Sequence, residues 1–184
     1  PGHGLSKVSW QFSVHVAKLN GKPVVRAALA GLLKPFSDSV NMVNAPVIAR
    51  ERSIEVAEVT HDRPGDYQTL IKLTVETERM ERSVSGTLFG GNKPRLVNIK
   101  GIEIEAELTS HMLYVTNEDK PGLIGNLGVV LGEAKANIAT FHLGRAEAGG
   151  DAMSLIQLDG PLDEASLEKI KQIPLVKQVK ALHF

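Results

Sequence analysis

Residues 112–138 of the chain, MLYVTNEDKPGLIGNLGVVLGEAKANI, decide how its second half folds. Met112–Thr116 is a short apolar run typical of a β-strand, and the polar residues 117–120 follow it. Pro121 suits a first helical position, because its missing backbone N–H would have no partner there. From that point apolar side chains recur at the spacing of one helical face, namely Leu123, Leu127, Val130, Leu131 and Ala134. The stretch therefore predicts a strand, a loop and a helix, which residues 135–137 close.

The residues downstream extend this pattern into a complete small domain. Three further strands are predicted, over residues 138–144, 152–158 and 175–184. A second helix begins at the acidic pair Asp163-Glu164 and stops before Pro174. The resulting order β-α-β-β-α-β is that of the ferredoxin-like fold. We therefore expect residues 110–184 to form a ferredoxin-like domain.

The first half predicts a less regular α+β domain over residues 8–109. Val8–Val16 alternates as a half-buried strand does, and Lys22–Leu33 has the apolar spacing of a helix. A second helix is expected after a cap at Asp38 or Ser39, with Pro46 at a break or kink. An antiparallel meander of successive strands follows, over residues 54–60, 68–77, 82–89, 95–99 and 102–108. The whole chain is thus predicted to be α+β, with two small domains and a linker or cloning remnant over residues 1–7.

Composition excludes several classes of protein. The 184 residues carry 21 Lys and Arg against 21 Asp and Glu, so a net charge of zero provides no broad positive field for a nucleic acid. There is no cysteine, which excludes disulfides and zinc sites that need sulfur. No apolar run approaches the ~18–20 residues of a membrane span. We therefore expect a cytoplasmic protein with neither a membrane nor a nucleic-acid partner.

The sequence also lacks the motifs of common catalytic and cofactor sites. No glycine-rich nucleotide loop follows a predicted strand, and the six histidines show no metal-ligand spacing. The glycines at 122, 125, 128 and 132 fall within the predicted helix, which indicates a helix whose backbone closely approaches a sheet or another subunit. We expect no catalytic residue, metal or cofactor in this chain.

The loop of residues 117–122 is the one concentrated polar feature of the second domain. It joins the end of a strand to the start of a helix, where free N–H groups favour an anion such as a carboxylate. An oxygen of Asp119 or Asn117 could accept from an ammonium group, so the loop would suit a zwitterionic amino acid, and Asn137 offers both a donor and an acceptor. A plainer alternative stays open, in which Asp119 caps the helix, Asn117 ends a strand and Asn137 forms a turn.

Several segments together resemble one family of enzymes. Residues 117–132, Ala136–Ala139 and Gly144-Arg145 resemble the ACT domain that ends D-3-phosphoglycerate dehydrogenases. Three upstream segments are similar to the intervening domain of the long form of these enzymes, also called the allosteric substrate-binding domain: Val43–Pro46, Ser85–Gly90 and Arg95–Gly101. The resemblance runs through nearly the whole chain in the order of the family.

The resemblance implies a regulatory function. Enzymes of this family oxidise 3-phosphoglycerate with NAD in the first step of L-serine biosynthesis, and many are inhibited by serine bound between two paired ACT domains. By this resemblance Asn117 and Asp119 lie in the loop that holds serine, and Asn137 reaches it from the partner subunit. The catalytic and NAD-binding domains are not in these 184 residues. The resemblance therefore implies the C-terminal regulatory part of such an enzyme, inactive alone and assembled as a homodimer or tetramer through its ACT domains.

Lys93, Arg95 and Lys100 suggest a second ligand. Three cations near one turn could hold a phosphate-bearing anion, whereas a solvated surface is the alternative. The resemblance assigns Arg95 to one basic position of an anion site between the two domains, but Glu107 and Gln157 stand at other basic positions of that site.

Two other functions stay open. The chain could be the small subunit of an iron–sulfur L-serine dehydratase, although the Ser-Ser-His-Thr segment of those enzymes is missing. It could also be an oligomerisation module without a ligand. The sequence leaves undecided whether serine, another amino acid or nothing binds.

Overall fold

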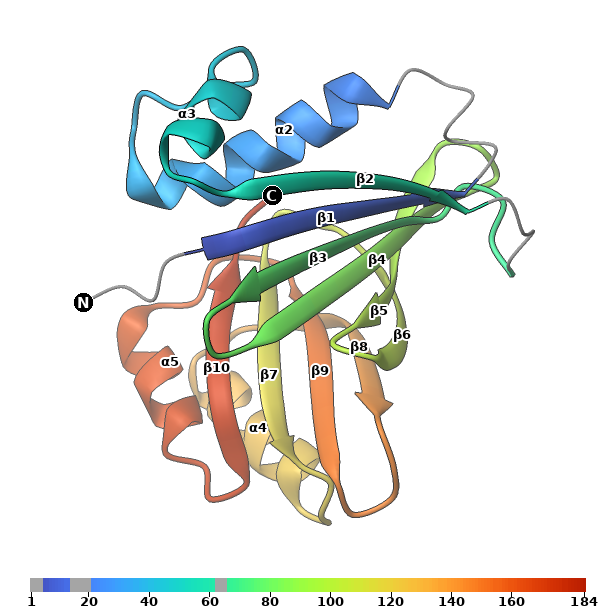
Figure 1. Cartoon of the computed structure of the whole chain (residues 1–184). Coiled ribbons are helices and arrows are strands. Elements are labelled where there is room, and N and C mark those ends of the chain that lie inside the picture. The colour runs from blue at the N-terminus through green and yellow to red at the C-terminus, as the bar shows by residue number, and fades with distance from the viewer. Residues whose placement is uncertain (1–4, 14–20, 62–65) are drawn as a thin grey trace. The chain divides into compact units, whose positions relative to one another are not determined.

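The structure, a computed structural model, describes residues 5–13, 21–61 and 66–184 (Figure 1). By their internal contacts, residues Pro1–Asn92 form one unit and Lys93–Phe184 a second. Val14 and Val16, which we expected in the first strand, lie outside the described residues. Among the described residues, none of the helices is both long and apolar enough to cross a membrane.

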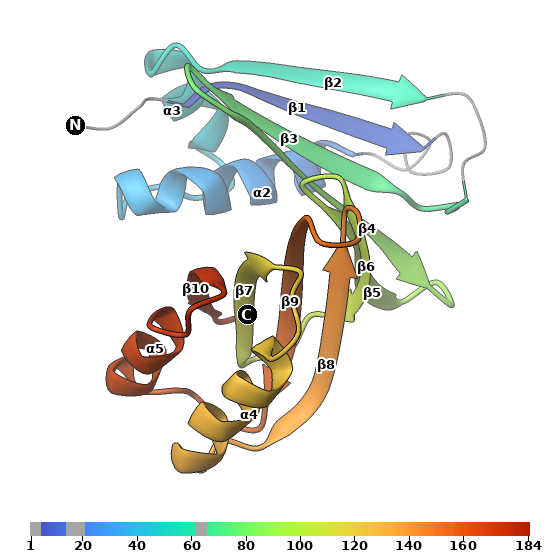
Figure 2. The same ribbon diagram turned by 90° about the horizontal axis from the view of Figure 1, so that it is seen from below.

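Alternating apolar residues build the first strand, as predicted. β1 (Leu5–Ser13) buries Val8, Trp10 and Phe12 on one face. Residues 5–7, which we placed in a linker, form the start of this strand. Two helices cover the same face of the sheet (Figures 1 and 2).

The first of these helices has the predicted bounds, whereas the second does not. α2 (Lys22–Leu33) is followed by a short 3₁₀ helix at Lys34–Phe36, and α3 spans Ala45–Glu51. The expected cap at Asp38 or Ser39 is therefore wrong. Pro46 lies in the first turn of α3, where a missing N–H breaks no helical hydrogen bond, so it causes no kink.

One strand of the first unit pairs differently from the expected meander. The order of the strands in this unit is β2-β1-β3-β4, with β2 at Glu55–His61, β3 at Ile71–Thr77 and β4 at Glu81–Phe89. β1 pairs in parallel with β2 and antiparallel with β3, so it lies between two strands that we predicted to be successive. A parallel pair needs a long crossover connection, and the segment with α2 and α3 supplies it. β3 and β4 form an antiparallel hairpin, as predicted.

The second unit contains the predicted ferredoxin-like fold. Its elements are β7 (Met112–Glu118), α4 (Leu123–Glu133), β8 (Ile138–Arg145), β9 (Asp151–Leu158), α5 (Glu164–Lys171) and β10 (Val176–Leu182). The strand order is β10-β7-β9-β8, and α4 and α5 cover one face of this sheet (Figure 2).

Backbone conformation sets both ends of α4. Gly122 has a φ of 102°, which places it outside the helix, so α4 begins at Leu123 and not at Pro121 as predicted. At the other end Lys135 has a φ of 54°, and the Ala136 N–H donates to the Leu131 carbonyl at 2.9 Å. This closing turn is a Schellman motif.

The glycines of α4 leave its surface open. A Cβ added at Gly125, Gly128 or Gly132 would meet nothing within 4 Å among the described residues. The expectation that these glycines let the helix approach a sheet closely is therefore wrong for the described chain. The other expectation, an approach to a second subunit, stays a prediction.

A hairpin packs on the other face of the ferredoxin-like sheet. β5 (Lys93–Ile99) and β6 (Ile102–Glu107) turn at Lys100-Gly101, where both residues have positive φ as a tight hairpin requires. Ile102 and Ile104 of β6 share a buried cluster with Met153 and Leu155 of β9. This packing joins β5 and β6 to the second unit, whereas the domain junction expected at residues 109–110 stays a prediction.

Gly144 of β8 should be intolerant of substitution because of this packing. An alanine Cβ there would lie 2.6 Å from the Glu103 carbonyl oxygen and 2.7 Å from Ile102 Cγ2. We expect Gly144→Ala to lower the free energy of unfolding by about 1–3 kcal/mol, since backbone must shift to remove the clash. Urea denaturation would measure it.

Gly31→Ala in α2 is the matched control, since a Cβ at this position would have no described atom within 4 Å. It should raise stability by up to about 1 kcal/mol through helix propensity. A Gly144→Ala variant as stable as the unsubstituted chain would contradict the close packing of β6 against β8.

Candidate functional site

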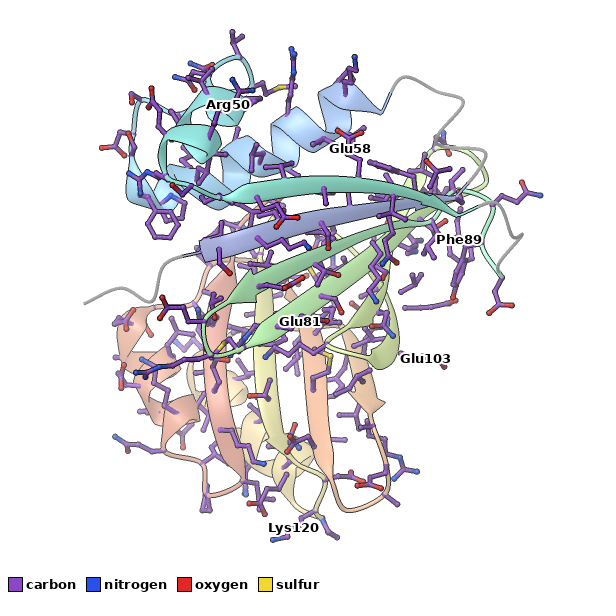
Figure 3. All side chains as sticks on the ribbon, in the orientation of Figure 1. Arg50, Glu58, Glu81, Phe89, Glu103 and Lys120 are labelled. Carbon is purple, nitrogen blue, oxygen red and sulfur yellow. The ribbon has the colours of Figure 1, made fainter. Side chains whose placement is uncertain are left out.

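A pocket of about 360 Å³ lies at the N-terminal end of α4. The β7–α4 loop and the first turn of α4 form most of its wall, and Leu143 and Arg145 of β8 complete it. Two of the predicted effector residues, Asn117 and Asp119, line this pocket together. Lys120 of the same loop marks this end of the sheet (Figure 3).

Asp119 is held by two donors from the β8–β9 hairpin. Its Oδ2 accepts a hydrogen bond from the Gly149 N–H at 3.0 Å and from Arg145 Nη1 at 3.1 Å. The Gly149 N–H, followed by the Arg145 guanidinium, lowers the pKa of this carboxyl group below its usual value. Asp119 is thus an ionised acceptor at neutral pH, and it does not cap α4 as the plainer alternative supposed.

Arg145 lies beside Asp119 in the same pocket, with 59% of its side chain exposed against 21% for Asp119. An exposed ion pair of this kind contributes little to stability, because water competes for both charges. The pocket therefore presents a carboxylate and a guanidinium group next to one another. Separating these two groups would cost little free energy.

Asn117 lies at the end of β7 with only 2% of its surface exposed. Its amide nitrogen donates to the Glu118 carbonyl at 2.7 Å, whereas its Oδ1 has no hydrogen-bond partner among the described residues. A buried acceptor without a donor is unfavourable by about 1–3 kcal/mol. Asn117 therefore lines the pocket and carries a buried acceptor whose donor is not among the described residues.

The N-terminus of α4 is a third polar feature of this pocket. No side chain caps it among the described residues, because Gly122 occupies the cap position. The N–H groups of the first helical turn have no partner within the helix and favour an anion. Leu123, Ile124 and Gly125 of this turn line the pocket.

Asn137 lies apart from the other two predicted residues. It precedes β8, beyond the opposite end of α4, and its side-chain nitrogen donates to Asp159 Oδ2 at 2.7 Å. The eleven residues of α4 span roughly 16 Å. A single chain therefore brings Asn117 and Asp119 together but leaves Asn137 outside their pocket.

The three basic residues predicted to hold an anion do not converge. Lys93 begins β5 and Lys100 follows its last residue, so the seven-residue strand separates them by roughly 20 Å. Arg95 forms an ion pair with Glu107 at 3.0 Å, and Lys100 lies over the ring of Tyr114 at 5.3 Å. The prediction grouped them by proximity in sequence, but a hairpin brings such neighbours together only at its turn.

Two further groups, Arg145 of the pocket lining and the Gly149 N–H that donates to Asp119, were not predicted as site residues. Arg145 of β8 and Asn117 of β7 both pair with Ala152 of β9, so these three residues lie at one end of the sheet. Counting residues along the predicted strands back from the turn would have found Arg145. Among the described residues no group of three or more acidic or histidine side chains could hold a metal ion.

Comparison with known proteins agrees with the resemblance. The model of the D-3-phosphoglycerate dehydrogenase intervening domain matches residues 2–100, and that of the ACT domain matches residues 111–175. The chain belongs to the D-3-phosphoglycerate dehydrogenase intervening-domain family. Its second unit contains an ACT domain, a type that in general binds small amino-acid effectors and dimerises.

Individual relatives carry related names. The chain is 34% identical to D-3-phosphoglycerate dehydrogenase of Methanocaldococcus jannaschii over 97% of its own length, and 34% identical to that of Bacillus subtilis over 95%. It spans only about a third of the length of these relatives, 34% of each. It is also 24% identical to a probable L-serine dehydratase beta chain of Bacillus subtilis, over 83% of this chain and 70% of that one.

The hydrogen bonds that the Asp119 carboxylate accepts, first from the Gly149 N–H and then from Arg145, should make stability depend on pH. The pKa of Asp119 is lowered in the folded state, so its contribution to stability is full above its usual pKa of 3.8 and is lost as the pH falls through the folded-state pKa. We expect Asp119→Asn to lower the thermal unfolding midpoint at pH 7. The difference from the unsubstituted chain should shrink as the pH falls below 3.8.

Glu51→Gln is the control, at an exposed glutamate that forms no ion pair with another described residue, and its unfolding midpoint at pH 7 should stay close to that of the unsubstituted chain. Thermal unfolding of the three proteins between pH 7 and pH 2 makes the comparison. A midpoint difference for Asp119→Asn that stays constant over this range would rule out the linkage.

Proposed function

We propose that the chain is a regulatory module of a D-3-phosphoglycerate dehydrogenase and that it senses L-serine at an interface between two ACT domains. The observation that carries the proposal is the pocket in which Asp119 and Arg145 lie side by side at the open N-terminus of α4. An amino acid is a zwitterion, and such a pocket offers one group of each sign to it.

The polar groups of the pocket suit each part of serine. The α-ammonium group would bind the Asp119 carboxylate, which the Gly149 N–H keeps in place. The α-carboxylate would bind Arg145 and the free N–H groups of α4. The serine hydroxyl would donate to Asn117 Oδ1, which has no other partner among the described residues. In this scheme serine separates the Asp119–Arg145 pair and replaces each partner.

A second copy of the chain would complete the site. β8 ends the four-stranded sheet, and its Leu143 is 45% exposed. α4 also exposes apolar side chains, with Ile124 56% and Val129 61% exposed. The glycines between them, Gly125 and Gly128, would allow a second α4 to approach closely. Two copies packed antiparallel along α4 and β8 would bring Asn137 of the partner to the pocket. The proposed assembly is thus a homodimer, or a tetramer built from it.

In this proposal other domains of the enzyme carry out the NAD-dependent oxidation of 3-phosphoglycerate, in the cytoplasm, and this chain alone has no catalytic activity. The similarity to a probable L-serine dehydratase beta chain supports a second candidate, the small subunit of such an enzyme. Deamination of serine in the presence of a partner subunit would distinguish the second candidate from the first.

Calorimetric titration with L-serine tests the site. We expect saturable binding that is weaker for D-serine and glycine and absent for serinol, which lacks the carboxylate. Asp119→Ala should weaken serine binding at least about thirtyfold, since a charged hydrogen-bond partner of the ammonium group is lost. Asp151→Ala is the matched control, because Asp151 pairs with Lys177 at the same end of the sheet but does not line the pocket. Equal affinity of the Asp119→Ala variant would sink the assignment.

Sedimentation velocity tests the contribution of the second copy. Val129→Glu places a charge on the exposed face of α4, so we expect it to dissociate the dimer and to weaken serine binding together. Met80→Glu changes a side chain of the first unit with 49% exposure and should leave both properties unchanged. A monomeric Val129→Glu variant that binds serine with full affinity would show that Asn137 of a partner is not needed.

A further inference from the structure

We propose that Asp159 is a positioning residue of the serine site, and that it serves the pocket of the partner subunit by orienting Asn137. This inference rests on the proposed function, in which Asn137 of one copy reaches the pocket of the other. Asp159 follows the last residue of β9 and does not line the pocket of its own chain. Its role follows from the residue that it holds.

Two hydrogen bonds join Asp159 to Asn137. The Asp159 N–H donates to the Asn137 carbonyl oxygen at 3.2 Å, and Asn137 Nδ2 donates to Asp159 Oδ2 at 2.7 Å. The first bond continues the antiparallel ladder of β8 and β9 beyond the pair of Ile138 with Leu158. The second bond holds the side chain. One residue thus fixes both the backbone and the amide group of Asn137.

The chemistry of a carboxylate decides which way this amide group points. An ionised carboxylate only accepts hydrogen bonds, whereas an amide group carries a donor nitrogen and an acceptor oxygen. The amide atom of Asn137 that faces Asp159 is therefore Nδ2, and Oδ1 is turned away from it. This Oδ1 has no hydrogen-bond partner among the described residues. Asp159 thus makes Asn137 present an acceptor to a ligand.

The backbone on the other side of Asn137 is fixed as well. The Schellman motif at Lys135 and Ala136 closes α4, and Asn137 is the next residue. Residues 137–140 are exposed, and β8 is the edge strand of its sheet (Figure 2), so a second copy can reach them. The acceptor is therefore held in place before a ligand binds, which lowers the entropy cost of binding.

The carboxylate of Asp159 has no other task among the described residues. Asp119 and Asp151 form ion pairs with Arg145 and Lys177, whereas Asp159 pairs with no cation in the described part of the chain. Asp159 and Asn137 are both exposed, so water competes for both groups and their hydrogen bond adds little to stability. Orientation of the amide group explains the contact better than stability does.

An acceptor at this position suits the ammonium group of the ligand. An α-ammonium group carries three N–H donors, and Asp119 takes one of them in the proposed site. Oδ1 of the partner's Asn137 takes a second. The ammonium group is then recognised from both subunits, and Asp159 contributes to this recognition without touching the ligand.

A double-mutant cycle, measured by calorimetric titration with L-serine, tests whether Asp159 acts through Asn137. Asp159→Ala should weaken binding about fivefold, since the amide group is then free to turn. In the Asn137→Ala background the same substitution should cause no further loss. Asp159→Asn should recover part of the affinity, because it keeps an acceptor at the same position. A merely structural role would lower the affinity equally in both backgrounds.

Mixed dimers of Asp119→Ala and Asp159→Ala chains test whether Asp159 serves the other subunit. One of their two sites takes Asp119 from the Asp159→Ala chain, and it takes Asn137 and Asp159 from the Asp119→Ala chain. This site contains no substitution, so we expect it to bind serine with the affinity of the unsubstituted chain. A role of Asp159 within its own chain would leave both sites weakened.

Gln157→Ala is the matched control. It removes a different side-chain hydrogen bond between the same two strands, from Thr140 Oγ1 to Gln157 Oε1 at 3.3 Å, and it should bind serine as the unsubstituted chain does. Unchanged affinity of the Asp159→Ala variant, equal losses in both backgrounds, or mixed dimers without a restored site would overturn the inference alone. Absence of serine binding by the unsubstituted chain would instead overturn the proposed function, and this inference with it, before any variant is compared.

Discussion

The hydrogen bonds of the Asp119 carboxylate tie the β7–α4 loop to the β8–β9 turn, and the pocket depends on them. Because Asp119 is engaged there, it is not available to cap α4, and Gly122 at the cap position has no side chain to do so. The helix therefore keeps a free N-terminus inside a pocket that already contains an ion pair. The hydrogen bonds of one carboxylate thus leave the N-terminus of α4 uncapped and place Arg145 beside Asp119 in the pocket.

The part of the fold that depends on local spacing could be predicted from the sequence. The apolar face of residues 123–134 and the acidic start at Asp163 indicate the helices of the ACT domain, because helical period and cap chemistry act within a few residues. The parallel pairing of β1 with β2 could not be predicted, since it depends on how two helices bring distant strands together. Backbone conformation is a further limit: the spacing alone includes Gly122 in the helix, whereas its positive φ places it outside.

The candidate site was predictable to the same extent. Asn117 and Asp119 share one loop, so proximity in sequence sufficed to group them. Arg145 reaches Asp119 across a hairpin, and this pairing follows from strand register and not from any motif. Lys93 and Lys100 were wrongly grouped for the opposite reason, because an extended strand moves residues apart by more than about 3 Å each. Charged residues that are close in the sequence therefore predict a cluster in space only where the backbone between them turns.

An effector changes the activity of an enzyme only if it binds one arrangement of the molecule more tightly than another. In the second unit β7 and β9 have residues on both faces of the sheet, so such a coupling would run from one face of the sheet to the other. Asn117 and Val115 of β7 face α4, while Met112 of the same strand belongs to the cluster beneath the β5–β6 hairpin. A densely packed sheet transmits a shift of one face to the other, since its core has no free volume to absorb it. In the proposed function, separation of the Asp119–Arg145 pair by serine would therefore act on the β5–β6 hairpin. Gly144 lies at the contact between β8 and that hairpin, where even a methyl group has no space. The close packing that makes Gly144 intolerant of substitution would also transmit a shift of β8 to the hairpin.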